Sequence, residues 1–104
     1  MRCVTTETEL NAELAAHPRV VLDCHAKWCG PCKLVGPTLQ RLEEEDGGAV
    51  LLLMLDVDDG QDLAAALNVR SLPTVCYYRF GKIMARVEGA DISGLNGAWA
   101  RLKN

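Results

Sequence analysis

The sequence predicts an α/β fold in which a central five-stranded mixed sheet is flanked by four helices. Two observations predict it. Short apolar segments typical of buried strands alternate with helical segments over the first part of the chain, and a hairpin followed by one helix closes it. A chain of 104 residues, 49% of them apolar, is long enough for one hydrophobic core and too short for two. We therefore expect a single domain over residues 1–104.

The N-terminal segment predicts an edge strand followed by a helix. We expect the strand over residues 1–4. Thr6 followed by Glu9 is the capping-box pattern, so a helix is expected over residues 6–16. Pro18 ends this helix because the residue before a proline disfavours helical backbone.

The next segment predicts a buried strand and a second helix. Residues 19–25 are β-branched and apolar apart from Asp23, a pattern typical of a strand covered on both faces. Pro31 suits the first turn of a helix that continues to a Gly-Gly break. Pro37 falls inside this helix and should kink it, because it removes one backbone donor and crowds the preceding turn.

The second half of the chain continues the alternation. A buried strand is expected over residues 50–57 and a short helix over residues 61–67. After a loop, a strand is expected over residues 74–79, and a turn at 80–82 leads to its partner at 83–87. A closing helix is indicated by core-facing apolar residues at helical spacing: Ile92, Leu95, Trp99 and Leu102.

Charge and hydropathy exclude several classes of function. The net charge is −3 and the chain has no run of Lys or Arg, so nucleic acid and anionic membranes are not expected as partners. The longest apolar run, residues 49–55, is far shorter than the ~20 residues that span a bilayer. The polar N-terminal segment matches neither a secretory signal nor a transit peptide, which predicts a cytoplasmic protein.

Among five cysteines, only Cys29 and Cys32 have a recognisable spacing, C-x-x-C. An odd count favours cytosolic thiol chemistry over a secreted disulfide scaffold. The alternative is half of a zinc site, which normally needs a second closely spaced pair of ligands, and the sequence offers none. We therefore expect no bound metal.

The predicted position of this pair at a helix N-terminus suits disulfide exchange. Unpaired backbone N–H groups and the helix dipole stabilise a thiolate there, so we expect Cys29 to be the accessible nucleophile. Cys32, three residues later on the same helical face, is within reach of the Cys29 sulfur. Cys29 would attack a substrate disulfide, and Cys32 would then cleave the mixed disulfide.

Asp23 is the candidate proton acceptor for Cys32. A carboxylate in an apolar strand should have a raised pKa, which lets it exchange a proton near neutral pH. The alternative is a structural acid at the end of the strand, hydrogen-bonded to backbone.

The segment Trp28-Cys29-Gly30-Pro31-Cys32-Lys33 resembles the active-site motif of the thioredoxin family, at the family's spacing from Val21-Leu22-Asp23. The resemblance continues through Pro37, Pro73-Thr74, Gly81 and Gly89, and cytosolic thioredoxins of eukaryotes look most similar. It implies a thioredoxin fold and a monomeric protein-disulfide reductase that maintains cell redox homeostasis.

The resemblance also implies a substrate surface. The family's proline at Pro73 is cis, and the backbone before it, at Ser71 and Leu72, pairs with substrate as an added strand. A flat apolar area around the dithiol would include Trp28, Gly30, Pro31, Leu72 and Gly89. A buried, structural Trp28 is the alternative.

By the same resemblance, the protein binds no cofactor and receives electrons from NADPH through a thioredoxin reductase. Implied targets are disulfide-containing proteins such as peroxiredoxins and ribonucleotide reductase. Two other functions stay open. The first is a disulfide oxidant or isomerase, which Pro31 disfavours because those proteins usually carry histidine at that position. The second is a binding module gated by oxidation state.

Several positions depart from the family pattern. Cys24 and His25 stand where Phe followed by Trp or Ser is common, and Met54 stands where a lysine is usual. Without that lysine Asp23 should be harder to ionise. We expect Cys24 and Cys76 to be buried as small apolar residues, His25 to be structural, and Cys3 to be exposed.

Overall fold

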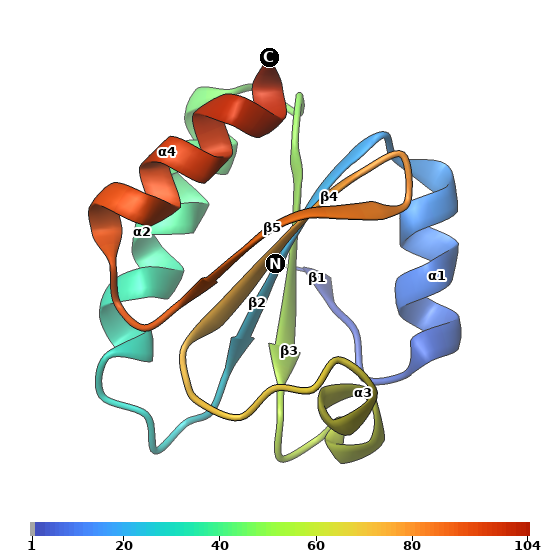
Figure 1. Ribbon diagram of the computed structural model, residues 1–104, viewed down its shortest axis with the longest axis vertical. Helices are drawn as coiled ribbons and strands as arrows, with labels where there is room; N and C mark the ends of the chain where they lie inside the picture. The colour runs from blue at the N-terminus through green and yellow to red at the C-terminus, as the bar shows by residue number, and fades with distance from the viewer. Residues whose placement is uncertain (1) are drawn as a thin grey trace.

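The computed structural model describes residues 2–104 and has one five-stranded sheet with four helices around it (Figure 1). The strands are β1 (Arg2–Cys3), β2 (Arg19–His25), β3 (Leu51–Asp56), β4 (Thr74–Arg79) and β5 (Lys82–Glu88). The helices are α1 (Glu7–Ala16), α2 (Cys32–Glu45), α3 (Gln61–Ala66) and α4 (Ile92–Lys103). The predicted fold class is confirmed.

The sheet is mixed, with strand order β1-β3-β2-β4-β5. β3 pairs in parallel with β1 and β2, whereas β4 pairs antiparallel with β2 and β5. α2 and α4 cover one face of the sheet, and α1 and α3 cover the other (Figure 1). β2 is the central strand of the sheet, and the loop of residues 26–31 connects its carboxyl end to the start of α2.

Two cores form because successive side chains of a strand point to opposite faces. Val21 of β2 packs with α2 and α4, whereas Leu22 packs with α1 and α3. Trp99 belongs to the first core and is 2% exposed, as the sequence predicts, and its indole N–H donates to Asp46. Alternation places Asp23 on the same face as Val21, beneath α2.

Most element boundaries agree with the sequence to within a residue or two. The Thr6 capping box forms, with Thr6 as the N-cap, so α1 begins at Glu7. β1 is shorter than the predicted edge strand, and position 1 lies outside the described residues. The predicted strand at residues 50–57 is one residue shorter at each end, and the predicted helix at 61–67 loses only its last residue. The second hairpin strand begins at Lys82, one residue earlier than predicted.

The second helix starts later than the sequence suggests. Pro31 is its N-cap, and the helix runs from Cys32 through Pro37 to Glu45. Pro37 has no N–H to donate to the carbonyl of Lys33, one turn earlier, which is the physical basis of the predicted kink. In residues 2–104, no helix combines the length and the apolar character that crossing a bilayer requires.

Candidate active site

The two cysteines of the C-x-x-C motif lie where β2 gives way to α2. Cys29 occupies the turn before the helix, and its backbone N–H donates to the Ala26 carbonyl at 3.1 Å. Cys32 is the first residue of α2. The expectation that both lie on one helical face is therefore wrong, because the helix begins only at the second cysteine.

The sulfurs of Cys29 and Cys32 are joined in a disulfide, with Cα atoms 5.4 Å apart. The N–H of Cys32 donates to the Cys29 sulfur at 3.2 Å. After reduction, this N–H and the dipole of α2 would favour a thiolate at Cys29. The local backbone therefore matches the chemistry that the sequence predicts for this pair.

The disulfide is more covered than the sequence suggests. Cys29 is 4% exposed and Cys32 is 6% exposed, and both pack with Ala26, Val57 and Leu72. These apolar neighbours surround the pair in the disulfide form, and the accessibility of the reduced Cys29 thiolate stays a prediction.

Asp23 is buried beneath the start of α2 without a hydrogen-bond partner. It is 1% exposed, and in residues 2–104 neither of its carboxyl oxygens bonds to a protein group. Loss of hydration disfavours the charged carboxylate and raises the pKa of Asp23 to about 7. The alternative of an acid satisfied by backbone is wrong, and the predicted direction of the pKa change is confirmed.

Gly36 of α2 and Met54 of β3 are neighbours of the Asp23 carboxyl. A Cβ atom added at Gly36 would lie 3.8 Å from Asp23 Oδ2 and 4.0 Å from Met54 Cε. Gly36 is four residues after Cys32. Asp23 therefore faces α2 about one helical turn, ~5.4 Å, further toward the C-terminal end of the helix than the second cysteine. Met54 is the register partner of Asp23 on β3 and brings a thioether instead of a positive charge.

Gly36 was not predicted from the sequence to lie near the site. A signal for it exists, because a glycine inside a helix costs about 1 kcal/mol relative to alanine and needs a packing reason. A Cβ at Gly36 would make only ordinary van der Waals contact with Asp23 and Met54, so crowding by the Asp23 carboxyl does not account for this glycine.

The loop before β4 faces the dithiol. The Leu72–Pro73 bond is cis, as the family resemblance implies. The Pro73 carbonyl accepts from the Gly89 N–H at 2.8 Å, and the Ser71 carbonyl accepts from the Thr74 hydroxyl at 2.6 Å. These bonds fix the loop, and Leu72 packs on the disulfide.

A shallow depression of about 190 Å³ lies between this loop and Trp28. Trp28, Ser71 and Leu72 line it together with Val57, Ala64, Val69 and Arg70. Gly30 and Pro31 are exposed in the turn between the cysteines, Gly89 is half-buried, and Pro73 is buried. The structure therefore brings together Trp28, Ser71 and Leu72, and ties Gly89 to Pro73 by a hydrogen bond.

Trp28 is 70% exposed, so the alternative of a buried, structural tryptophan is wrong. Its indole N–H donates to Asp58 Oδ2 at 2.9 Å, which holds the ring beside the depression. Asp58 was not predicted from the sequence as a site residue. Its position in the acidic segment just after β3, at the same end of the sheet as the dithiol, was the available signal.

Replacing Asp58 with alanine should release the Trp28 indole. We expect the Trp28 N–H resonance to shift and broaden in NMR spectra, and KM for a protein disulfide to rise several-fold with little change in kcat. The Trp99 indole, which donates to Asp46, is an internal control whose resonance should not move. Because the bond is exposed, unfolding free energy should fall by only about 1 kcal/mol or less. An unchanged Trp28 resonance would contradict this role.

The remaining cysteines lie apart from the depression. Cys3 is exposed, as expected, and Cys24 and Cys76 are fully buried on neighbouring strands. The Cys24 and Cys76 thiols hydrogen-bond to each other, and this bond together with burial raises the pKa of Cys24. Within residues 2–104, no three His, Cys, Asp or Glu side chains are grouped closely enough to hold a metal ion.

Comparison with known proteins identifies the family. The family model described as Thioredoxin matches residues 2–97. Thioredoxin-2 of Saccharomyces cerevisiae is 37% identical over 94 residues, which cover 89% of each chain. Mitochondrial thioredoxin of Mus musculus is 40% identical over 70 residues, 67% of this chain, and this stretch covers only 42% of the mouse protein.

Solved structures agree with this result. Oxidised mitochondrial thioredoxin 3 of Saccharomyces cerevisiae superposes with a TM-score of 0.92 at 28% identity, covering 98% of this chain and 95% of that one. A structure of the thiol resolving mechanism of a yeast mitochondrial 1-Cys peroxiredoxin via glutathione/thioredoxin systems gives a TM-score of 0.91 at 27% identity, with the same coverage. With its bonded C-x-x-C pair at the start of α2 and its cis proline opposite, this chain belongs to the thioredoxin family.

Proposed function

We propose that this protein reduces disulfides in other proteins by cycling the Cys29–Cys32 pair between dithiol and disulfide. The observation that carries the proposal is the bonded pair itself, with the first N–H of α2 directed at the Cys29 sulfur. The unpartnered carboxyl of Asp23 beneath the same helix supports it, because a group with a pKa of about 7 exchanges protons near neutral pH.

In the proposed cycle, the Cys29 thiolate attacks one sulfur of a substrate disulfide and the other leaves as a thiolate. Asp23 accepts the proton of the Cys32 thiol. The Cys32 sulfur then attacks Cys29, the mixed disulfide breaks, and the second substrate sulfur leaves. Two electrons pass to the substrate, and the Cys29–Cys32 disulfide remains.

We propose that substrates bind across the depression beside the disulfide. Backbone groups of Ser71 and Leu72 would pair with an extended substrate segment, next to Pro73. Trp28, Gly30, Pro31 and Gly89 would add apolar contact around it. The exposure of Trp28 and the packing of Leu72 on the disulfide support this assignment.

We further propose recharging by an NADPH-dependent thioredoxin reductase and targets that include peroxiredoxins and ribonucleotide reductase. Membership of the family supports the reductase, and the structure of a related protein described with a peroxiredoxin supports that target class. Three unpaired cysteines favour a reducing compartment such as the cytoplasm. The curated mouse relative is mitochondrial, so the mitochondrial matrix is the other compartment to test. We propose a monomer as the working state.

Insulin reduction tests this function. With NADPH and a thioredoxin reductase, the protein should catalyse cleavage of insulin disulfides over many turnovers. The reaction is followed as a loss of NADPH absorbance and as an increase in turbidity when the reduced insulin precipitates. If the reduced protein binds a partner stably but does not accelerate insulin reduction above the rate with dithiothreitol alone, it is a binding module gated by oxidation state. Catalysed oxidation of a reduced substrate with glutathione disulfide as the oxidant, without NADPH, reductase or dithiothreitol, would indicate an oxidant instead.

A further inference from the structure

The depression beside the disulfide carries a positive charge at Arg70. Within residues 2–104, every other residue that lines this depression is neutral. Arg70 is exposed and lies two residues before Leu72, which packs on the disulfide. Two residues span at most about 7 Å of chain. A substrate segment that pairs with Ser71 and Leu72 therefore passes within reach of the Arg70 guanidinium group.

The Arg70 side chain is held at one nitrogen and is free to donate from the others. Its Nε donates to Asn68 Oδ1 at 3.1 Å. Within residues 2–104, its two terminal nitrogens form no hydrogen bond and no ion pair. A guanidinium group has five N–H donors, and two of them can bind both oxygens of one carboxylate. Arg70 is therefore oriented beside the depression in a way that suits a carboxylate.

Asn68, which holds Arg70, is itself held in place. It follows the end of α3 with φ of 58°, a conformation that asparagine and glycine adopt there. Arg86 of β5 donates to the carbonyls of Leu67 and Asn68 at 2.6 and 2.7 Å. Arg86 also lies 3.9 Å from the Glu88 carboxylate, so its charge is already paired. Of the two arginines bonded to Asn68, Arg70 is the one left to bind a carboxylate from another molecule.

The acidic residues that follow β3 do not line this depression. Asp58 accepts the indole N–H of Trp28. Together with Asp59 and Asp62, it lines a separate hollow between the starts of α1 and α3. These acids disfavour a substrate carboxylate on the Trp28 side of the depression, because like charges repel. A substrate carboxylate therefore fits the Arg70 side.

We propose that Arg70 selects substrates that carry a carboxylate about two residues from the attacked cysteine. This inference rests on the proposed reduction of disulfides by Cys29 and adds a class of substrate to it. While the substrate backbone pairs with Ser71 and Leu72, its Glu or Asp side chain accepts two hydrogen bonds from the terminal nitrogens of Arg70. Disulfides in acidic segments are thereby reduced in preference to those in basic segments.

Three peptide disulfides test this preference. Each is a disulfide-linked dimer of a nonapeptide with a central cysteine, and carries glutamate, glutamine or lysine two residues before and after it. The reduced full chain is mixed with each peptide, and acid quenching followed by mass spectrometry gives the rate at which peptide thiols are released. In each turnover, the Cys29–Cys32 dithiol becomes a disulfide and one peptide disulfide becomes two thiols.

Substitution of Arg70 should change the ratio of the rates for the glutamate and lysine peptides. Comparing this ratio between protein variants cancels the different intrinsic reactivities of the peptides. Arg70→Glu should lower the ratio about tenfold and Arg70→Gln about threefold, because an exposed charge is reversed in one and only removed in the other. High salt should lower the ratio of the native protein in the same direction.

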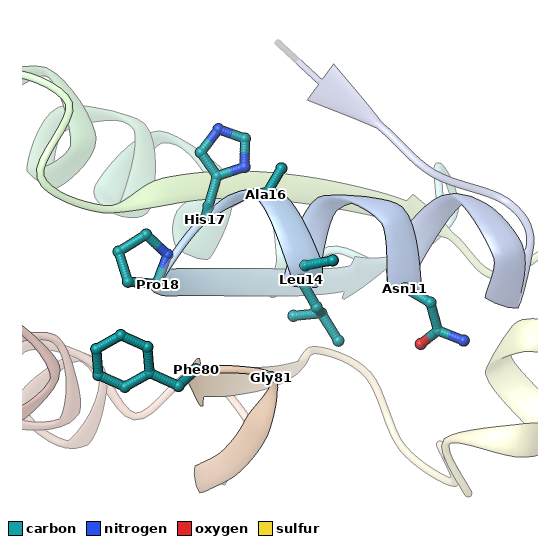
Figure 2. Close-up of a pocket in the computed structure, with 8 residues that line it drawn as sticks. Asn11, Leu14, Ala16, His17, Pro18, Phe80 and Gly81 are labelled. Carbon is teal, nitrogen blue, oxygen red and sulfur yellow. The ribbon is translucent and has the colours of Figure 1, made fainter.

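Lys82→Glu is the matched control, because it changes the net charge by the same amount as Arg70→Glu. Lys82 follows Gly81, which lines a pocket between α1 and the β4–β5 turn (Figure 2). This turn lies at the end of β4 away from Pro73 and the disulfide. Lys82→Glu should therefore leave the glutamate-to-lysine ratio within about twofold of the native value.

Asn68→Gly tests how Arg70 is positioned. Glycine suits the positive φ but removes the oxygen that accepts from Arg70 Nε. The ratio of the rates for the glutamate and glutamine peptides should fall toward that of Arg70→Gln. A merely structural role of Asn68 would slow all three peptides alike.

Failure of the preference can be told apart from failure of disulfide reduction. If the native chain reduces all three peptides but Arg70→Glu leaves the ratio unchanged, reduction stands and the preference is wrong. If Lys82→Glu lowers the ratio as much as Arg70→Glu does, net charge causes the effect and the preference is also wrong. If the native chain releases no thiol from any peptide, the proposed function fails and this inference fails with it.

Discussion

Replacing Cys29 with serine should abolish disulfide reduction, and replacing Cys32 should stop it at the mixed disulfide. A serine hydroxyl does not attack disulfides, so Cys29→Ser should lose about 10³-fold or more of the insulin-reducing rate. Cys32→Ser keeps the attacking sulfur but has no second sulfur to release the product. We expect it to accumulate covalent adducts through Cys29.

Mass spectrometry of each variant, after incubation with a disulfide peptide, measures these outcomes directly. Cys32→Ser should gain the mass of one peptide half, removable with dithiothreitol, and Cys29→Ser should gain nothing at this site. Cys3→Ser is the matched control, since it removes an exposed thiol outside the motif and should leave the rate unchanged. Trapping by Cys29→Ser instead would make Cys32 the attacking sulfur and reverse the proposed roles.

Replacing Asp23 with asparagine should stabilise the fold at neutral and alkaline pH. The folded-state pKa is raised to about 7 from 3.8, so between these values the unfolded chain gives up a proton that the folded chain keeps. Stability from this group is therefore present below pH 3.8 and is lost as pH rises to 7. A change of about 3 pKa units corresponds to about 4 kcal/mol as an upper bound.

Urea unfolding of the oxidised native and Asp23→Asn proteins at pH 4.5 and pH 8 measures this effect. The stability advantage of the variant should grow by about 2–4 kcal/mol from the lower to the higher pH. Other carboxylates titrate in both proteins, so the difference isolates Asp23. In reduction assays, Asp23→Asn should slow release of the mixed disulfide, because Cys32 loses its proton acceptor.

Met54→Lys provides the matched control for this interpretation. Met54 is the register partner of Asp23 and lies beside it near Gly36. An ammonium group there should favour the charged carboxylate, lower the pKa of Asp23 and flatten the fall in stability toward pH 7. A native protein whose stability relative to Asp23→Asn does not depend on pH would contradict the burial effect.

The local patterns of the chain predicted the elements because each depends on neighbours in sequence. Thr6 and Glu9 start α1 by a contact three residues apart, and the alternation around Val21 requires only that the strand be covered on both faces. The C-x-x-C spacing alone brought the two sulfurs within bonding reach. These predictions survived with small errors at element ends, where hydrogen-bond ladders stop.

Contacts between distant segments were beyond such patterns. Nothing in the sequence near Trp28 shows that Asp58 holds its indole, or that Gly36 is the part of α2 that faces the Asp23 carboxyl. The burial of Cys29 also arises from Val57 and Leu72, which lie on other elements. Each of these depends on how strands and helices pack, which residue spacing does not encode.

The sequence by itself determined the fold class, the reactive pair and the acid beneath it, because these follow from periodicity, spacing and one polar residue in an apolar strand. Only the tertiary structure decided how that acid is surrounded and how much of the disulfide is exposed. Burial, pKa and surface charge are properties of side chains brought together by packing, so they exist only once the chain has folded.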